Sequence, residues 1–196
     1  MMTSPNVICS GATEPSPRGV RTLPGGIDSN EFKKAFRNHA AGVAVVTADD
    51  GSGPVGLTAT SVFSVSAEPP ILVFSISDQS SSAPTIRNAD TVVVHLLGVD
   101  QLEIAKLCAT SGIDRFADRS IWNRLVTGEP FFPSAFAWIR GAVIEKVTAG
   151  SSTLMVVQAL QSNAPTPDSI ETEPQTTRPL VYHNRTWHEL GDHSRV

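Results

Sequence analysis

The chain has 196 residues, of which 40% are hydrophobic and 17% charged, and its formal net charge at pH 7 is -4. This length and composition predict one globular domain with its own core, and the negative charge without a lysine or arginine cluster argues against nucleic acid as a partner. Cys9 and Cys108 form neither a disulfide framework nor a zinc signature, and no apolar run or leader segment indicates a membrane or secretion, so we expect a cytoplasmic protein.

The N-terminal part divides into a tail and the start of the folded domain. Residues 1–27 are rich in Pro, Gly, Ser and Thr without hydrophobic periodicity, which predicts a disordered tail. The domain itself is expected over residues 28–192. It begins with a short helix that Asp28 or Ser29 can cap, with two phenylalanines on one face and basic residues on the outside.

A hairpin is expected after this helix. Residues 43–47 form a short apolar strand, residues 49–51 (Asp-Asp-Gly) favour a turn, and residues 55–60 return as the partner strand. The glycines across this turn match the G-x-G-x-x-G spacing of dinucleotide-binding proteins. We reject that interpretation, because the fingerprint needs a helix to begin inside it, whereas Pro54 and the β-branched residues after it continue a hairpin.

Residues 54–76 carry the most informative pattern in the chain. Residues 55–60 mix small and hydroxyl-bearing side chains, and after a Pro-Pro pair residues 71–76 form an apolar strand that we expect to be buried on both faces. Small residues leave backbone amides and short hydroxyls accessible, which suits a flat polar ligand or a phosphate. The alternative is a Thr/Ser-rich edge strand, since β-branched threonine favours sheets.

A second hydroxyl-rich segment lies directly downstream. Residues 77–82 read SDQSSS, and a helix with proline in its first turn is expected from there to Asn88. Ser80, Ser81 and Ser82 before a helix start predict an anion site, because hydroxyls and unpaired amide groups meet there. The alternative is ordinary helix capping, which needs only one serine.

The remainder of the chain predicts further strands and one more helix. Expected in order are a strand over residues 92–97, a helix to residue 109 with an Asp100–Glu103 capping box, a loop over 111–122, strands over 136–147 and 154–160, an exposed loop over 162–178 and a closing hairpin over 180–190. Seven or eight mostly antiparallel strands and three helices predict a mostly β protein, a β-barrel with peripheral helices. Three helices cannot cover strands that are apolar on both faces, so we predict a homodimer that buries one sheet face.

Side chains that could act as acids, bases, nucleophiles or metal ligands are sparse. No G-x-S-x-G elbow supports a serine nucleophile, no carboxylates are paired, and no histidine has the spacing of a metal site, so we expect no metal. The histidines are His39, His95, His183, His188 and His193, of which His183 and His188 lie on adjacent hairpin strands and can meet. If the protein is an enzyme, a cofactor carries the reaction and the protein supplies position and electrostatics.

Six segments in the same order resemble the short-chain flavin reductase family, also described as the flavin reductase-like FMN-binding split-barrel domain. They are FRNHAAGVAVVTADD (36–50), GLTATSVFSVSAEPPILVFSI (56–76), SSSAPTIRNA (80–89), VVHLLGVDQLEIAKLCA (93–109), DRFADRSIW (114–122) and PLVYHNRTWHEL (179–190). The similarity covers nearly all of residues 32–190 and excludes the tail.

The resemblance implies a dimeric split β-barrel that holds FMN or FAD at the dimer interface and reduces it with NADH or NADPH. The best-known members of this family are reductase components of two-component flavin monooxygenases, so the resemblance also implies a partner monooxygenase. By position, the resemblance implies a flavin site made of Gly56, Leu57, Thr58, Ala59, Thr60 and Ser61 along the isoalloxazine ring, Ser75 and Ser77 at the ribityl chain, and Ser80, Ser81 and Ser82 at the phosphate. It also implies Arg87 and Arg115 as charge partners of the phosphates and Phe116 as a wall of the nicotinamide side.

Two positions depart from the family pattern. Gly150-Ser151-Ser152 stands where relatives commonly carry Gly-Asp-His, whose histidine is associated with the pyridine nucleotide, and His95 stands in the place of an asparagine. The alternative function is therefore a flavin-binding split-barrel protein without reductase activity, such as a carrier, a sensor or a partner subunit. A barrel that binds another ligand, such as haem, is a third alternative.

Overall fold

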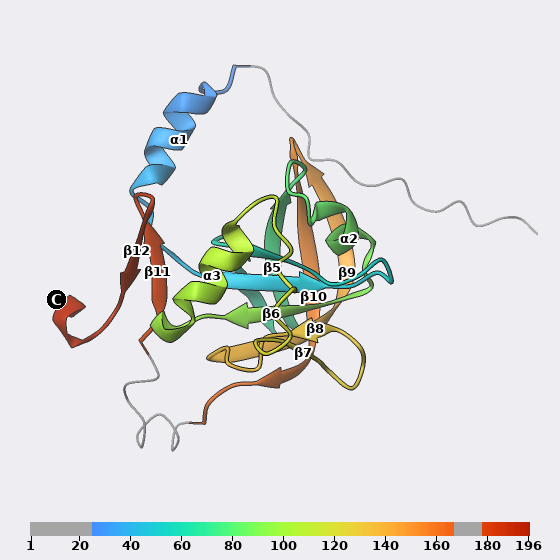
Figure 1. The fold of residues 1–196 in the computed structure, drawn as a ribbon. Helices are drawn as coiled ribbons and strands as arrows, with labels where there is room; N and C mark the ends of the chain where they lie inside the picture. Colours follow the sequence, from blue (N-terminus) through green and yellow to red (C-terminus); the bar gives the residue numbers. More distant parts are fainter. Residues whose placement is uncertain (1–24, 167–177) are drawn as a thin grey trace, which may run out of the picture.

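The computed structural model describes residues 25–166 and 178–196 (Figure 1). Its helices are α1 (Ser29–Arg37), α2 (Ala83–Asn88) and α3 (Leu102–Ala109), with 3-10 turns η1 (Val99–Gln101) and η3 (Asp192–Ser194). Its strands are β1 (Ala41–Gly42), β2 (Ala44–Ala48), β3 (Val55–Ala59), β4 (Phe63–Ala67), β5 (Pro70–Ser77), β6 (Thr91–Leu96), β7 (Asn123–Arg124), β8 (Pro130–Phe131), β9 (Ala137–Ala149), β10 (Ser152–Asn163), β11 (Leu180–His183) and β12 (Thr186–Glu189). The predicted tail up to residue 24, and residues 167–177 of the predicted exposed loop, lie outside the described residues.

Seven strands form one sheet in the order β3-β2-β6-β9-β10-β5-β4, and smaller sheets are β1-β11-β12 and β7-β8. Every strand pair in the described ranges is antiparallel, as predicted. Figure 1 shows α2 and α3 against the main sheet, whereas α1 extends away from it beside the β11–β12 hairpin. Within the described ranges no helix is long and apolar enough to cross a membrane. The prediction of a mostly β protein with few helices is confirmed.

The predicted hairpins are confirmed. β2 pairs with β3 across the turn at residues 49–51, and because no helix begins inside this turn, the rejection of a dinucleotide fingerprint is also confirmed. β9 pairs with β10, and β11 pairs with β12. The last turn consists of Asn184 (φ 46) and Arg185 (φ 64), and two left-handed residues are what a tight type I′ hairpin turn requires.

One full strand was not predicted. β4 pairs with β5 through a turn that contains Glu68 and Pro69, so the Pro-Pro pair lies at a hairpin turn instead of breaking the chain between two separate elements. The alternation in FSVSA was the available signal for this strand. β1, β7 and β8 have two residues each and are too short to show a periodicity. β10 continues to Asn163, so the first two residues of the predicted exposed loop belong to a strand.

The core consists of two buried clusters on opposite sides of β2. Alternate residues of a strand point to opposite faces, so Val46 joins the cluster that contains Phe74 and Ile86, while Val45 joins the cluster that contains Phe132. Residues of α2 lie in the first cluster and residues of α3 in the second. This arrangement explains why the β2 segment is apolar on both faces.

The start of the third helix differs from the prediction. The predicted Asp100–Glu103 capping box is wrong, because the Gln101 side chain accepts the hydrogen bond from the Gly98 amide at 2.8 Å, and the helix proper begins only after the 3-10 turn η1. Glu103 instead pairs with Lys106 on the helix surface at 2.8 Å. The 3-10 turn shifts the N-cap of the helix from Asp100 to Gln101, and a capping box needs a fixed spacing from the N-cap.

Candidate functional site

The residues that the sequence singles out begin on β3, where small side chains let the strand pack closely against the domain. Leu57 and Ala59 lie in the core, and Thr58 Oγ1 donates to the carbonyl of Ala105 in α3 at 2.6 Å. A Cβ atom at Gly56 would lie 3.4 Å from the sulfur of the α3 cysteine. The side chains of β3 are therefore engaged inside the domain.

The accessible part of this segment begins where β3 ends. The side chain of Thr60 is exposed and, within the described residues, its hydroxyl has no protein partner. The amide of Ser75 donates to Ser61 Oγ at 3.1 Å, and Ser61 Oγ donates to the Ser75 carbonyl at 3.3 Å. The structure therefore brings two predicted site residues together and holds the β3–β4 linker against β5.

The end of β5 contacts the turn that departs from the family pattern. Ser77 lies opposite Ser152 in the β5–β10 register, and the amide of Asp78 donates to the carbonyl of Ser151 at 3.0 Å. Ser77 Oγ also accepts a hydrogen bond from the Gln79 amide at 3.3 Å. The position where the resemblance implies a histidine therefore lies beside the hydroxyl-rich end of β5.

The three predicted phosphate-binding serines have different environments. Ser82 is 1% exposed, and its hydroxyl donates to the carbonyl of Gly56 at 2.9 Å and makes no capping hydrogen bond. Ser80 Oγ accepts from the Ser82 amide at 3.4 Å. Ser81 is exposed. Ser82 therefore links α2 to β3, and the hydroxyl of Ser81 is the most accessible of the three.

The two predicted charge partners are both held by protein groups. Arg87 pairs with Asp78 at 2.5 Å. Arg115 Nη1 donates to Ser82 Oγ at 3.1 Å, and Arg115 Nη2 donates to the carbonyl of Thr110 at 2.7 Å. Arg115 therefore fixes the loop over residues 111–122 to the serine segment at the start of α2.

Phe116, which the resemblance implies as a wall of the nicotinamide side, lies in the core. Its side chain is 5% exposed. The ring meets Trp122 edge-on at a centroid distance of 5.0 Å and stacks on Phe132 at 5.7 Å. These contacts hold the ring behind β3, next to Gly56.

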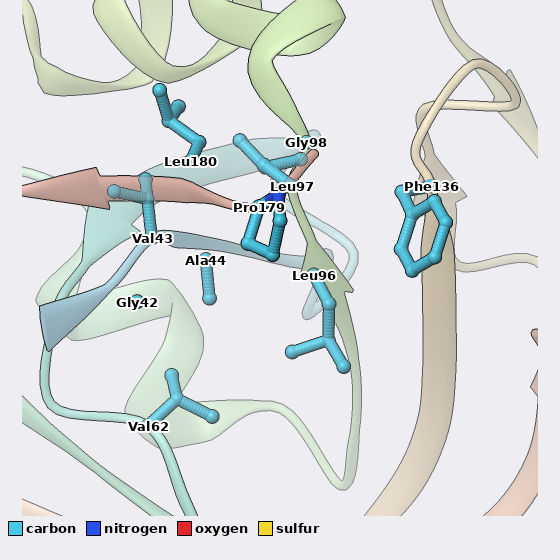
Figure 2. A pocket seen from close by; sticks show the side chains of 10 residues that line it. All are labelled: Gly42, Val43, Ala44, Val62, Leu96, Leu97, Gly98, Phe136, Pro179 and Leu180. Carbon is cyan, nitrogen blue, oxygen red and sulfur yellow. The ribbon is translucent and has the colours of Figure 1, made fainter. Parts of the chain in front are cut away.

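A cavity of about 210 Å³ lies next to the β3–β4 linker. Its lining is apolar and includes Val62, Leu96, Phe136 and Pro179 (Figure 2). Figure 2 shows Phe136 across the hollow from Leu96 and Pro179. This cavity suits the apolar edge of a flat ring system.

A larger groove of about 1130 Å³ shares Gly42 and Val62 with this cavity. Its lining residues come mainly from α1 (Phe32, Lys33, Lys34, Phe36, Arg37), the β3–β4 linker and first residue of β4 (Thr60, Ser61, Val62, Phe63), and the β11–β12 hairpin (Tyr182, Asn184, Arg185). The helix α1 is capped by Asp28 as predicted, with Oδ1 accepting from the Asn30 amide at 2.7 Å, but none of its residues is buried. Sequence reasoning placed the basic residues of α1 in solvent and missed this groove, because its walls come from segments far apart in the chain.

His95 is fully buried and connects two parts of the domain. Its Nδ1 lies 2.9 Å from the Val45 carbonyl, and its Nε2 accepts from the Phe132 amide at 3.1 Å. A carbonyl only accepts and an amide only donates, so the ring is neutral with its proton on Nδ1. Burial lowers the pKa of His95 to about 4, although the hydrogen bond to Val45 opposes this shift. His95 is therefore a structural residue.

The predicted meeting of His183 and His188 is confirmed, with ring centroids 5.5 Å apart. His183 Nε2 also lies 2.9 Å from Asn38 Oδ1. In residues 25–166 and 178–196, no group of three or more His, Cys, Asp or Glu side chains has the geometry of a metal site.

Comparisons with known proteins agree with one another. A family profile described as "Flavin reductase like domain" matches residues 36–191. An "NADH:FMN oxidoreductase" from Rhodococcus qingshengii is 40% identical over 185 residues, which cover 93% of this chain and 94% of the relative. The reductase component of a 4-nitrophenol 4-monooxygenase/4-nitrocatechol 2-monooxygenase from Rhodococcus opacus is 29% identical over 140 residues, covering 71% of this chain and 75% of the relative. The solved structure of a flavin reductase domain protein from Arthrobacter sp. FB24 matches with a TM-score of 0.75 at 30% identity, over 84% of this chain and 96% of that one.

Proposed function

This chain belongs to the flavin reductase-like family, and from that premise we propose that it is a cytoplasmic NAD(P)H-dependent flavin reductase that acts on FMN or FAD. The name of the Rhodococcus qingshengii relative supports FMN as the flavin and NADH as the co-substrate. The relative from Rhodococcus opacus is named as the reductase component of a monooxygenase, which supports a separate flavin-dependent monooxygenase as the recipient of the reduced flavin.

The observation that best supports flavin binding is the order of three surfaces along the β3–β4 linker and β5. An apolar cavity at Val62 is followed by the accessible hydroxyl of Thr60 and then by the serines at the end of β5. A flavin has the same order of groups, since an apolar ring edge leads to a polar ring edge and then to a phosphorylated chain. The residues present therefore fit a flavin.

Within this site we assign two kinds of role to the residues that the resemblance implies. Thr60, Ser61, Ser75, Ser77, Ser80, Ser81 and Arg87 are the residues that would contact the flavin. Gly56, Leu57, Thr58, Ala59, Ser82, Arg115 and Phe116 would hold the linker and the serine segment in place, since their side chains are engaged inside the domain or with one another.

The protein contributes to the reaction mainly by positioning the flavin and the nicotinamide. When bound, the flavin supplies the redox chemistry by accepting a hydride from the reduced nicotinamide. The Ser61–Ser75 hydrogen bonds fix the linker, so its amides and the Thr60 hydroxyl are oriented before the ligand arrives. The apolar cavity excludes water beside them. Ser152 has no titratable group, so the proposal assigns no proton transfer to its turn.

The proposal includes a homodimer of split barrels formed by residues 28–192. Exposed apolar side chains lie on strands near one another in the main sheet, with Phe63 57% exposed on β4, Ile144 48% on β9 and Leu160 52% on β10. These exposed apolar side chains of the main sheet support association with a second copy.

Flavin titration followed by NADH and NADPH oxidation tests the proposal. We expect the fluorescence of FMN to be quenched when it binds. We expect the wild type to turn over on the order of 10 per second, the usual median for enzymes. Thr60→Val should weaken FMN binding about tenfold because it removes a free hydroxyl at the site, whereas Thr186→Val on β12 should not. Tight FMN binding with turnover below about 1 per second would favour the flavin-binding protein without reductase activity.

A further inference from the structure

The basic side chains of this protein are unevenly partnered. Of the thirteen lysines and arginines in the described residues, six form ion pairs with carboxylates. Arg115 and Lys146 donate to other protein groups, and Arg119 stacks on Trp122. The remaining four are Lys33, Lys34, Arg37 and Arg185, and all four line the groove between α1 and the β11–β12 hairpin.

The groove therefore concentrates positive charge in a protein whose net charge is -4. No aspartate or glutamate of the described residues lines it: Asp28, which caps α1, and Glu31 of α1 are not part of its wall. Since no carboxylate in the groove wall neutralises the four basic side chains, the groove favours an anionic ligand. The volume of about 1130 Å³ slightly exceeds the usual range for small-molecule sites, so the ligand is expected to be long.

Two further features of the groove define the ligand. Aromatic side chains of Phe32, Phe36 and Tyr182 line it, and such rings stack on planar bases. Thr60 and Ser61, which we assign to the flavin site, form part of the same wall. A ligand in the groove therefore reaches the flavin site with one end.

We propose that this groove binds the diphosphate and adenosine part of the nicotinamide dinucleotide through Lys33, Lys34, Arg37 and Arg185. The inference rests on the proposed function and names the residues that hold its co-substrate. Gly150-Ser151-Ser152 lacks the histidine that relatives commonly use near the pyridine nucleotide, and α1 supplies binding groups from elsewhere in the chain. Coverage by a second copy of the chain is less favourable, because it would bury four cations without carboxylate partners from the groove wall.

A charge-reversal variant tests the proposal on the intact protein. Lys33 and Arg37 are four residues apart on α1, so Lys33→Glu/Arg37→Glu changes one side of an exposed helix and should not affect folding. Arg119→Glu/Arg195→Glu is the control, since it reverses the same number of charges on exposed residues outside the groove. The donors compared are NADH and 1-benzyl-1,4-dihydronicotinamide, a hydride donor without phosphate.

We expect the groove variant to raise the KM for NADH about tenfold or more, with kcat and turnover of the benzyl donor unchanged, and we expect the control to match the wild type. The wild-type KM for NADH should also rise with salt, since screening weakens exposed charges. The proposal would be overturned by an unchanged KM for NADH or by an equal loss of activity with both donors. A change of oligomeric state of the groove variant, measured by light scattering, would also overturn it, because the groove would then be a subunit interface. NAD⁺ titration by calorimetry separates this result from the proposed function, because it reports binding even if the wild type lacks reductase activity.

Discussion

Replacing His95 should destabilise the fold, because this ring connects β6 to β2 and to the chain after β8. His95→Leu leaves the Val45 carbonyl and the Phe132 amide without the partners that lie 2.9 Å and 3.1 Å away. An unsatisfied buried group costs about 1–3 kcal/mol, so the two together should lower the free energy of unfolding by about 2–6 kcal/mol at neutral pH. The exposed His188→Leu on β12 serves as the control.

The same residue should give stability a defined dependence on pH. Burial lowers the pKa of His95 in the folded state to about 4, below the ordinary value of 6.5. The unfolded chain therefore binds a proton first as pH falls, and the folded state loses stability between about pH 6.5 and pH 4. At 1.36 kcal/mol per unit, this loss reaches about 2 kcal/mol by pH 5.

Urea unfolding of both proteins, followed by tryptophan fluorescence at neutral pH and at pH 5, measures both effects. The difference in stability between wild type and His95→Leu should be largest at neutral pH and should shrink by about 2 kcal/mol at pH 5, since leucine does not titrate. A difference that is small at neutral pH, or that stays constant between the two pH values, would refute this account of His95.

Three further perturbations test local packing. Burial raises the pKa of the Cys108 thiol to about 12, so in a Cys9→Ser background a thiol reagent should label Cys108 only after unfolding, and rapid labelling of the native protein would contradict its burial. Gly141→Ala should lower the free energy of unfolding by about 1–3 kcal/mol, because a Cβ atom there would lie 2.4 Å from Val157 Cγ1, and an unchanged urea midpoint would show that the two strands can separate freely. Ser82→Ala should lower the free energy of unfolding by about 1–3 kcal/mol because it removes the buried hydrogen bond from the serine hydroxyl to the Gly56 carbonyl, and calorimetry should show a lower melting temperature than for the exposed Ser81→Ala.

The parts of the fold that could be predicted from sequence depend on local patterns. The β2–β3 and β11–β12 hairpins follow from turn residues between apolar runs, and α2 follows from its proline in the first turn. The proximity of Arg115 to the serine segment was implied by the resemblance and is present in the structure. β4 was not predicted because we interpreted the Pro-Pro pair as a break between two separate elements, although such a pair is equally suited to a hairpin turn.

The remaining features depend on contacts between distant segments. Phe116 is buried because Trp122 and Phe132 surround it, and no local pattern shows that these rings meet. The hydroxyl of Ser82 donates to the carbonyl of Gly56, which lies 26 positions away in the chain. The cationic groove joins Lys33 to Arg185, and neither position carries a motif. Spacing reveals periodicity within an element, whereas these sites arise from how elements pack together.

The central claim is that this protein transfers a hydride from a reduced nicotinamide to a flavin bound beside the β3–β4 linker. The most direct test is to mix the FMN-saturated wild type with NADH without oxygen and follow the absorbance of oxidised flavin in a single turnover, with Ser152→His in parallel. Our account predicts rapid bleaching in the wild type, with little further gain from the histidine. Bleaching no faster than that of free FMN, restored only in Ser152→His, would instead show a flavin-binding protein that lacks reductase activity.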